Sequence, residues 1–565
     1  MIKIKTIIGN FKSELWWIDI ILCAILGFTF STSKYYLKSG ECNMSYEIVI
    51  NSIILTIIFI LTCVLGRKLI KKFSEEKNIK GKFSKLFEIN RCFTIKMAGI
   101  ILICWIPILC MLFPGTFIND TWGQLQSVIN LKNGIWNISA HHPVFDTFVM
   151  SSIILPIVYK TGKWHVAMFI YVILQAIVTS FAFAYSLKYA KSKLKLNDVA
   201  IFIFLIIYCF LPIFPLSVQT VSKDALFSWI YVFFCIYFTE IIRVKGDCLK
   251  DKKFIIKFLI VILFCSLTKK TGIYVIIGSL ITLLIFLHEY WKKILTILLI
   301  LCMITFGIIP IMYKVFSIKQ SGKQEMFSLM FQQTARYVKY NSQNVNEYEK
   351  NVINKVLIYD SLCTAYNPTN ADYVKGFSQR GKDSDYIEYL KVWISQGLKK
   401  PNDYIIAMNS MLSGWFSFSE YKPLNDMNWH NQLNINLIPK WVPVREPIFQ
   451  KTADIVNSCY DFIYKIPVIN VILSYGFYAT LLPAFVLSTL LKRKNYRKCL
   501  NWIFIIPLML SIIIGCWMAP VSVHLEGMRY LYPVVYTTIF SLMWCIYSSK
   551  NTEYISENKD ECKYN

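Results

Sequence analysis

The sequence predicts an all-α polytopic membrane protein, and three observations lead to this fold class. Of the 565 residues, 55% are hydrophobic and only 17% are charged, with a mean hydropathy of +0.47. Ordinary globular domains carry about 25% charged residues. Apolar runs long enough to cross a bilayer recur along most of the chain. Lysine and arginine gather in the short segments between these runs, as they do in cytoplasmic loops.

The net charge of +26 arises from 60 Lys and Arg residues against 34 Asp and Glu residues. In a soluble protein this excess would indicate a nucleic-acid partner, but the apolar composition favours a membrane with anionic lipids. We therefore expect membrane lipids, and no nucleic acid, among the partners. Most of the 17 cysteines lie inside apolar runs, where a thiol behaves as a small hydrophobic group.

A helix needs about 20 apolar residues to cross a bilayer core of roughly 30 Å. Twelve segments come near this length, so we expect about 12 transmembrane helices. They lie near residues 15–31, 47–65, 94–113, 165–187, 198–215, 224–242, 254–268, 272–288, 294–312, 469–490, 501–519 and 529–547.

Residues 144–160 are a thirteenth apolar segment, and the positions of basic residues decide how we interpret it. Residues 66–92 contain nine basic and three acidic residues, which places this loop in the cytoplasm. If 144–160 does not cross, three further basic loops are also cytoplasmic; if it crosses, all three lie outside, against the trend. We therefore predict a helix lying along the outer surface at 144–160, in a cell-membrane protein with both termini cytoplasmic. The three loops are 188–195, 243–253 and 491–498.

The same topology divides the chain into three parts. Residues 1–312 form an N-terminal transmembrane module whose first outer loop is 114–164. Residues 313–467 form an exoplasmic domain, which we expect to be mainly helical because its apolar residues recur at spacings of three and four. Residues 468–565 contain the last transmembrane helices and a cytoplasmic tail.

Asp120 follows the third predicted span, at the level of the outer membrane surface. A carboxylate is costly there, so it is a functional candidate. Pro114-Gly115 ends the span, and Asn119 or Asp120 then occupies the expected N-cap of the next helix. The helix dipole keeps an aspartate at this position ionised, which suits a base or a metal ligand. The alternative, that Asp120 only caps the helix, stays open.

Two histidines stand in the same outer loop, in the segment SAHHPVFD at 139–146. Adjacent histidines point in different directions, and no third ligand has a matching spacing, so a metal site is not favoured here. His142 precedes Pro143, which holds it in an extended conformation and allows it to face a cavity. For His141 we expect a solvated loop residue.

Basic residues on the outer side break the positive-inside trend. Lys223-Asp224 opens one span, and Lys269-Lys270 separates two others. A single lysine could simply extend its ammonium group to the interface. Three lysines near two aspartates instead indicate an anion-binding pocket.

Arg529 enters the last span, an unusual place for a permanent charge. It could pair with Glu526 three residues earlier, while Tyr530 fits an interfacial aromatic belt. A guanidinium group here suits a lipid phosphate, because it donates two parallel hydrogen bonds to phosphate oxygens.

The order of these features resembles the GT-C superfamily of polytopic membrane glycosyltransferases, such as protein O-mannosyltransferases and aminoarabinose transferases. Two departures are the pair Asn119-Asp120, where many members have two acidic residues, and Val144, where the superfamily's HPPL-type segment has a second proline. The resemblance covers roughly 94–312 and 469–547. It rests on PGTFINDTWGQ (114–124), HHPVFDTFV (141–149), KDALF (223–227), LTKKTG (267–272) and EGMRYLYP (526–533).

The resemblance implies a GT-C-like fold and transfer of a sugar from a polyprenyl-phosphate donor to a cell-envelope acceptor on the outer face. Asp120 would be the general base, and the anomeric carbon would be inverted. A divalent metal ion held by Asp120 and Asp224 stays open, because some members use one and others do not. The implied roles are catalytic for Asp120, Asp224 and His142, phosphate-binding for Arg529, Lys269 and Lys223, and substrate-binding for Gln124, Glu526 and Tyr530.

A lipid-linked sugar flippase or transporter is the alternative, since the same charges could line a translocation path. Transporters commonly place charges and broken helices at mid-membrane. Here the charges cluster at the outward ends of the spans, which favours the enzyme. The sugar and the acceptor are not identified by the sequence.

Overall fold

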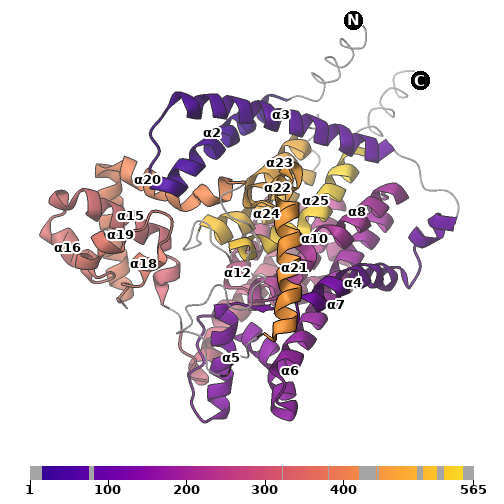
Figure 1. Cartoon of the computed structure of the whole chain (residues 1–565), viewed down its shortest axis with the longest axis horizontal. Helices are drawn as coiled ribbons and strands as arrows, with labels where there is room; N and C mark the ends of the chain where they lie inside the picture. The colour runs from indigo at the N-terminus through magenta and orange to yellow at the C-terminus, as the bar shows by residue number, and fades with distance from the viewer. Residues whose placement is uncertain are drawn as a thin grey trace, which may run out of the picture.

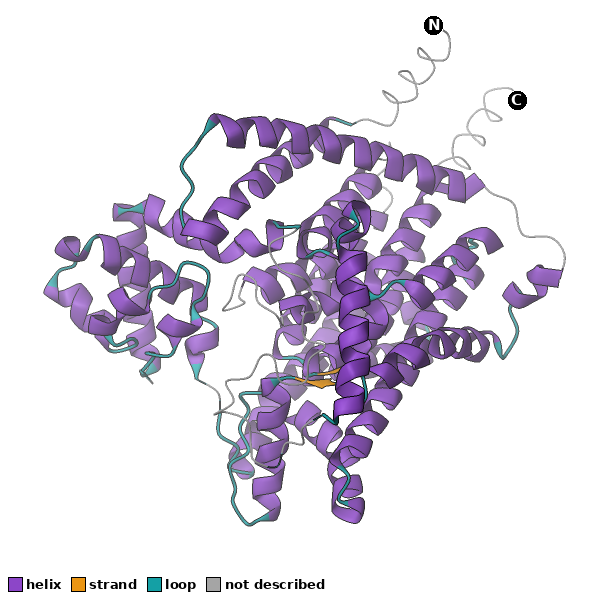
Figure 2. Cartoon of the chain, viewed as in Figure 1, coloured by secondary structure: helices purple, strands orange, loops and turns teal. Residues whose placement is uncertain are grey.

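The described part of the polypeptide is mostly helical. A computed structural model describes residues 16–75, 82–320, 322–379, 381–418, 441, 445–492, 500–517 and 527–550 (Figure 1). Within these ranges the only named strands are β1 (Thr116–Phe117) and β2 (Thr220–Val221), drawn in orange near the centre of Figure 2. The predicted all-α class is confirmed.

The helices follow one another with short connections in most of the chain. They are α2 (Trp17–Ser39), α3 (Tyr46–Glu75), α4 (Phe93–Met111), α5 (Asn119–Lys132), α6 (Val144–Thr161), α7 (Trp164–Ser192), α8 (Asp198–Phe210), α9 (Ile213–Val218), α10 (Lys223–Arg243), α11 (Lys252–Thr268), α12 (Lys270–Phe286), α13 (Trp291–Cys302), the π-helix η4 (Met303–Ile308), α14 (Ile309–Val315), α15 (Ser328–Tyr340), α16 (Glu347–Asn354), α17 (Leu362–Ala365), α18 (Asp372–Lys375), α19 (Asp383–Lys399), α20 (Pro401–Leu412), α21 (Pro447–Tyr464), α22 (Pro467–Leu473), α23 (Leu482–Leu491), α24 (Ile505–Ile512), the 3-10 helix η14 (Gly527–Leu531) and α25 (Tyr532–Lys550).

Nine helical segments among the described residues are long and apolar enough to cross a membrane. A tenth is added if the pair Pro467–Leu473 and Phe477–Leu491, bent by 64°, counts as one span. The protein is therefore a multi-pass membrane protein. The nine are Trp17–Ser39, Tyr46–Glu75, Phe93–Met111, Val144–Thr161, Trp164–Ser192, Lys223–Arg243, His288–Val315, Leu500–Trp517 and Gly527–Lys550.

Three of the twelve predicted spans form shorter helices. The segment at 198–215 gives α8 with 13 residues, because Leu211 precedes Pro212 and takes an extended backbone conformation. The segments at 254–268 and 272–288 give α11 and α12, each with 17 residues. Lys269 is extended between them and interrupts the helix. The number twelve stays a prediction.

Helix α6 is the segment predicted to lie along the outer surface. Its 18 residues have the length and apolar composition of a membrane span. One face packs on α7 and buries Asp146, Thr147 and Ser151 among apolar residues. Length and composition therefore admit a crossing that the basic loops disfavour, and the surface location stays a prediction.

The predicted exoplasmic domain, residues 313–467, contains a separate hydrophobic core. This core includes only part of the predicted range. It joins buried residues of α15, α16 and α19, from Phe331 to Val392, in the helical unit on the left of Figure 1. Helix α21 packs instead on α4. It buries Ala453, Tyr460 and Tyr464 in the main core of the apolar helices.

A short parallel pairing brings two distant outer segments together. Thr116 lies opposite Thr220, and Phe117 opposite Val221. The approach is close because Gly115 has a φ of +102°, and a β-carbon there would lie 3.0 Å from the carbonyl oxygen of Gln219. The pairing sets the start of α5 beside the start of α10, where the candidate site lies.

Replacing Gly115 with alanine should destabilise this junction. The added methyl group would meet Val172 Cγ2 at 2.6 Å in a backbone conformation that alanine rarely adopts. We expect Gly115→Ala to lower the free energy of unfolding by about 1–3 kcal/mol, measured by thermal unfolding in detergent. Gly99→Ala is the matched control, because nothing lies within 4 Å of its β-carbon position in α4. A Gly115→Ala protein as stable as Gly99→Ala would contradict this account of the junction.

Candidate functional site

Asp120 lies in the first turn of α5, with its carboxylate facing two cations. Its Oδ2 atom is 2.6 Å from Lys223 Nζ and 2.8 Å from Arg529 Nη1. The N-cap of α5 is Ile118, which makes no side-chain cap hydrogen bond. The predicted cap position was therefore wrong by at least one residue, and the ion pairs give the carboxylate a role that capping does not explain.

The electrostatic surroundings keep Asp120 ionised. Burial alone would raise the pKa of Asp120, but Lys223 and Arg529 hold it well below its usual range. One quarter of the Asp120 side chain is still exposed. This carboxylate is thus both charged and reachable from outside the protein.

Asp224 forms the second, fully buried part of the same cluster. Its Oδ1 is 2.6 Å from Lys269 Nζ, and its Oδ2 is 3.8 Å from Arg529 Nη1. The side chain of Asp224 is 0% exposed and that of Lys269 is 8% exposed. Lys269 therefore points into the protein toward a carboxylate and does not extend to an interface. Removing one partner of such a buried ion pair is strongly destabilising, because it leaves an uncompensated buried charge.

The cluster is assembled by elements far apart in the sequence. Lys223 and Asp224 begin α10, whose first turn is capped by the Ser222 hydroxyl accepting a hydrogen bond from the Ala225 amide. Lys269 occupies the break between α11 and α12, and Arg529 belongs to η14. Ends of helices thus bring these four charges to one point.

His142 stands beside Lys223, as its predicted position before a proline allows. Its Nδ1 atom is 3.2 Å from Lys223 Nζ and 4.0 Å from Asp120 Oδ2. Burial, with the charge of Lys223, lowers the pKa of His142 to about 3. Because an ammonium group only donates, the neutral imidazole accepts this hydrogen bond at Nδ1.

Of the three residues predicted to bind substrate, Tyr530 and Gln124 are described and lie in different surroundings. Tyr530 follows Arg529, and its hydroxyl oxygen is 3.3 Å from Arg529 Nη2. Gln124 is buried on α5, where its amide nitrogen donates to Asp146 Oδ2 at 2.7 Å and to Thr147 Oγ1 at 2.9 Å. Glu526 lies outside the described residues.

Asp146 is a buried carboxylate that was not among the site residues predicted from the sequence. It is 2% exposed. Its four-residue spacing from His142 was the available signal. Asp146 accepts a hydrogen bond from Gln124 and so links α6 to α5, the helix that carries Asp120. This link helps to position α5.

The carboxylates do not fit a divalent metal ion. Asp120 and Asp224 are each paired with basic side chains, whose positive charges repel a metal cation from the same oxygen atoms. In the described part of the chain, no group of three His, Cys, Asp or Glu side chains is placed to hold one. The described cluster joins three basic side chains to two carboxylates.

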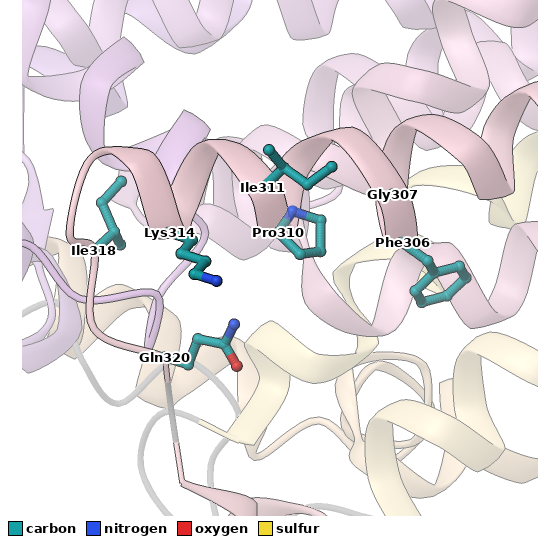
Figure 3. A pocket seen from close by; sticks show the side chains of 7 residues that line it. All are labelled: Phe306, Gly307, Pro310, Ile311, Lys314, Ile318 and Gln320. Carbon is teal, nitrogen blue, oxygen red and sulfur yellow. The ribbon is translucent and has the colours of Figure 1, made fainter.

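An open groove lies on the segment that supports the histidine loop (Figure 3). Its volume is about 570 Å³. Ser139 pairs with Lys319, and the Ala140 amide donates to the Lys319 carbonyl at 2.8 Å. One wall of the groove is therefore attached to the loop just before His142. The lining residues are Phe306, Gly307, Pro310, Ile311, Lys314, Ile318 and Gln320.

Comparison with known proteins gives one family. The family described as "Family of unknown function (DUF6020)" matches residues 136–559, which is most of the chain. No curated protein and no solved structure matches. The match includes Lys223, Asp224, Lys269 and Arg529 but begins after Asp120.

Removing the buried cation should destabilise the protein more than removing the exposed one. Lys269→Met leaves the buried Asp224 charge without its nearest partner, and we expect a loss of about 3–5 kcal/mol in unfolding free energy. Lys223→Met leaves a carboxylate that water reaches, so its loss should be about 1 kcal/mol or less.

Thermal unfolding in detergent measures both losses. The double variant Asp224→Leu/Lys269→Met, which removes both buried charges, should recover much of the loss seen in Lys269→Met. Equal losses in Lys269→Met and Lys223→Met would contradict the division into a buried and an exposed pair.

Proposed function

Because the chain belongs to the DUF6020 family, whose description assigns no activity, we propose a function from the site itself. The protein is a GT-C-type glycosyltransferase of the cell membrane. It transfers a sugar from a polyprenyl-phosphate donor to a hydroxyl group of a cell-envelope acceptor on the outer face.

One observation carries this proposal: the partly exposed carboxylate of Asp120 lies within 3 Å of both Lys223 Nζ and Arg529 Nη1. A sugar phosphate needs cations for its phosphate and a base for the attacking hydroxyl, and this arrangement supplies both. Among the described residues, the ion-paired cluster joins three cations to two carboxylates. The excess positive charge favours an anionic ligand.

The proposed reaction is a single displacement. The acceptor oxygen attacks the anomeric carbon and forms the new glycosidic bond, while its proton passes to the Asp120 carboxylate. The bond from the anomeric carbon to the phosphate oxygen breaks, and its electron pair stays on the phosphate. Lys223, Lys269 and Arg529 stabilise that charge. Attack opposite the leaving group inverts the anomeric carbon.

The remaining residues position these groups. Asp224 fixes Lys269 and Arg529, and His142 accepts a hydrogen bond from Lys223. Gln124 orients α5 through Asp146, while Tyr530 and Glu526 stay candidates for contacts with the sugar. No step requires a metal ion.

The topology belongs to the same proposal. It has about 12 crossings, a surface helix at 144–160, both termini in the cytoplasm and residues 313–467 outside. The excess of basic residues in 66–92 supports this orientation.

Replacing Asp120 with asparagine should abolish sugar transfer while the protein still folds. The amide cannot accept the hydroxyl proton, so we expect the rate to fall by about 10²–10⁴-fold. Purified protein reconstituted in vesicles with a labelled polyprenyl-phosphate sugar and a cell-envelope extract measures this rate.

Asp360→Asn is the matched control, because that side chain is 85% exposed and distant from the site in sequence; it should keep full activity. Wild-type activity in Asp120→Asn would overturn the choice of base. Vesicles that move the labelled donor across the bilayer without transferring its sugar would identify a flippase.

The pH dependence of kcat/KM should lack an acidic limb in the neutral range. The pKa of Asp120 lies well below its usual range and that of His142 is about 3. The active forms therefore persist as the pH falls and are lost only below about pH 4. Transfer rates at low donor concentration measure this profile. A limb centred at about pH 6.5, the ordinary histidine value, would contradict it.

A further inference from the structure

We propose that the donor phosphate competes with Asp120 for Lys223 and Arg529, so that donor binding turns this carboxylate into an effective base. The inference rests on the proposed function and adds an order to it. The donor binds first, and the acceptor hydroxyl is activated afterwards.

The competition follows from the sharing of one oxygen atom. Lys223 Nζ and Arg529 Nη1 both contact Oδ2 of Asp120, at 2.6 and 2.8 Å. A carboxylate oxygen with two charged partners is stabilised as an anion and accepts a proton poorly. A phosphate offers more acceptor oxygens than a carboxylate and draws the same two side chains.

The two parts of the cluster differ in their accessibility. The side chains of Asp120, Lys223 and Arg529 are 25%, 19% and 11% exposed. Lys269 and Asp224 are almost completely enclosed. An incoming anion therefore meets the pairs of Asp120 before it meets the pair of Asp224.

Two contacts keep the cations in place when they leave Asp120. Asp224 Oδ2 lies 3.8 Å from the same Nη1 atom of Arg529. His142 Nδ1 lies 3.2 Å from Lys223 Nζ. Both cations can thus turn from Asp120 to a phosphate without losing every protein partner.

The chemical consequence is that Asp120 becomes more basic once the donor phosphate has bound. Once the phosphate holds the two cations, Asp120 keeps its negative charge with weaker compensation and a phosphate anion nearby. Both effects favour proton uptake. The hydroxyl proton then passes to Asp120 as the bond to the anomeric carbon forms.

Binding of a phosphate probe to the full-length protein tests this inference without sugar transfer. The probes are farnesyl phosphate and, separately, inorganic phosphate, with the protein in nanodiscs of zwitterionic lipid. Asp120→Asn removes the competing charge, so we expect farnesyl phosphate to bind about tenfold more tightly than to the wild type. Asp360→Asn, the matched control, should bind as the wild type does.

Unchanged or weaker binding of farnesyl phosphate to Asp120→Asn overturns the competition, as does tightening that is confined to inorganic phosphate. Asp120→Ser provides a second variant if the asparagine protein fails to fold, which gel filtration and thermal unfolding reveal. Tighter binding without sugar transfer from any donor in the wild type would refute the proposed function and leave the competition standing. Sugar transfer by the wild type, with unchanged farnesyl phosphate binding to Asp120→Asn, would refute the competition and leave the proposed function standing.

Discussion

The charge of Asp224 is the constraint on which the arrangement of the site depends. Removing a carboxylate from water costs several kcal/mol unless a cation and hydrogen bonds compensate for it. Asp224 is fully buried, and Lys269 and Arg529 are its cationic partners. They come from the break after α11 and from η14, so the buried charge holds three distant parts of the chain at one point.

The close pairing of β1 with β2 places a second, partly exposed ion pair, Asp120 with Lys223, beside this buried charge. Consecutive residues at the start of α10 project in different directions, so Lys223 reaches Asp120 while Asp224 faces inward. Gly115 allows the close approach that sets α5 against α10. The Asp224–Lys269 pair is therefore enclosed, whereas the neighbouring Asp120–Lys223 pair stays partly exposed.

The class of fold could be predicted from the apolar composition of the chain. The charged residues of the site could be predicted from their positions between apolar runs. A charge between apolar runs is conspicuous, and Asp120, Lys223 and Arg529 were found in this way. The partners could not be predicted, since they depend on helix packing across hundreds of residues. The pair of Lys269 with Asp224 is an example: the backbone is extended at Lys269, between α11 and α12, and the ammonium group lies 2.6 Å from Asp224 Oδ1.

A carboxylate that serves as a base beside an anionic donor has conflicting requirements. Without compensation, its charge repels the phosphate and destabilises the empty site; with permanent compensation, it accepts a proton poorly. Cations that the carboxylate shares with the phosphate satisfy both requirements at different stages. This sharing needs movable cations close to the exposed carboxylate and a fixed charge behind them. In the proposed mechanism, Lys223 and Arg529 are the movable cations beside Asp120, and Asp224 is the fixed charge behind them.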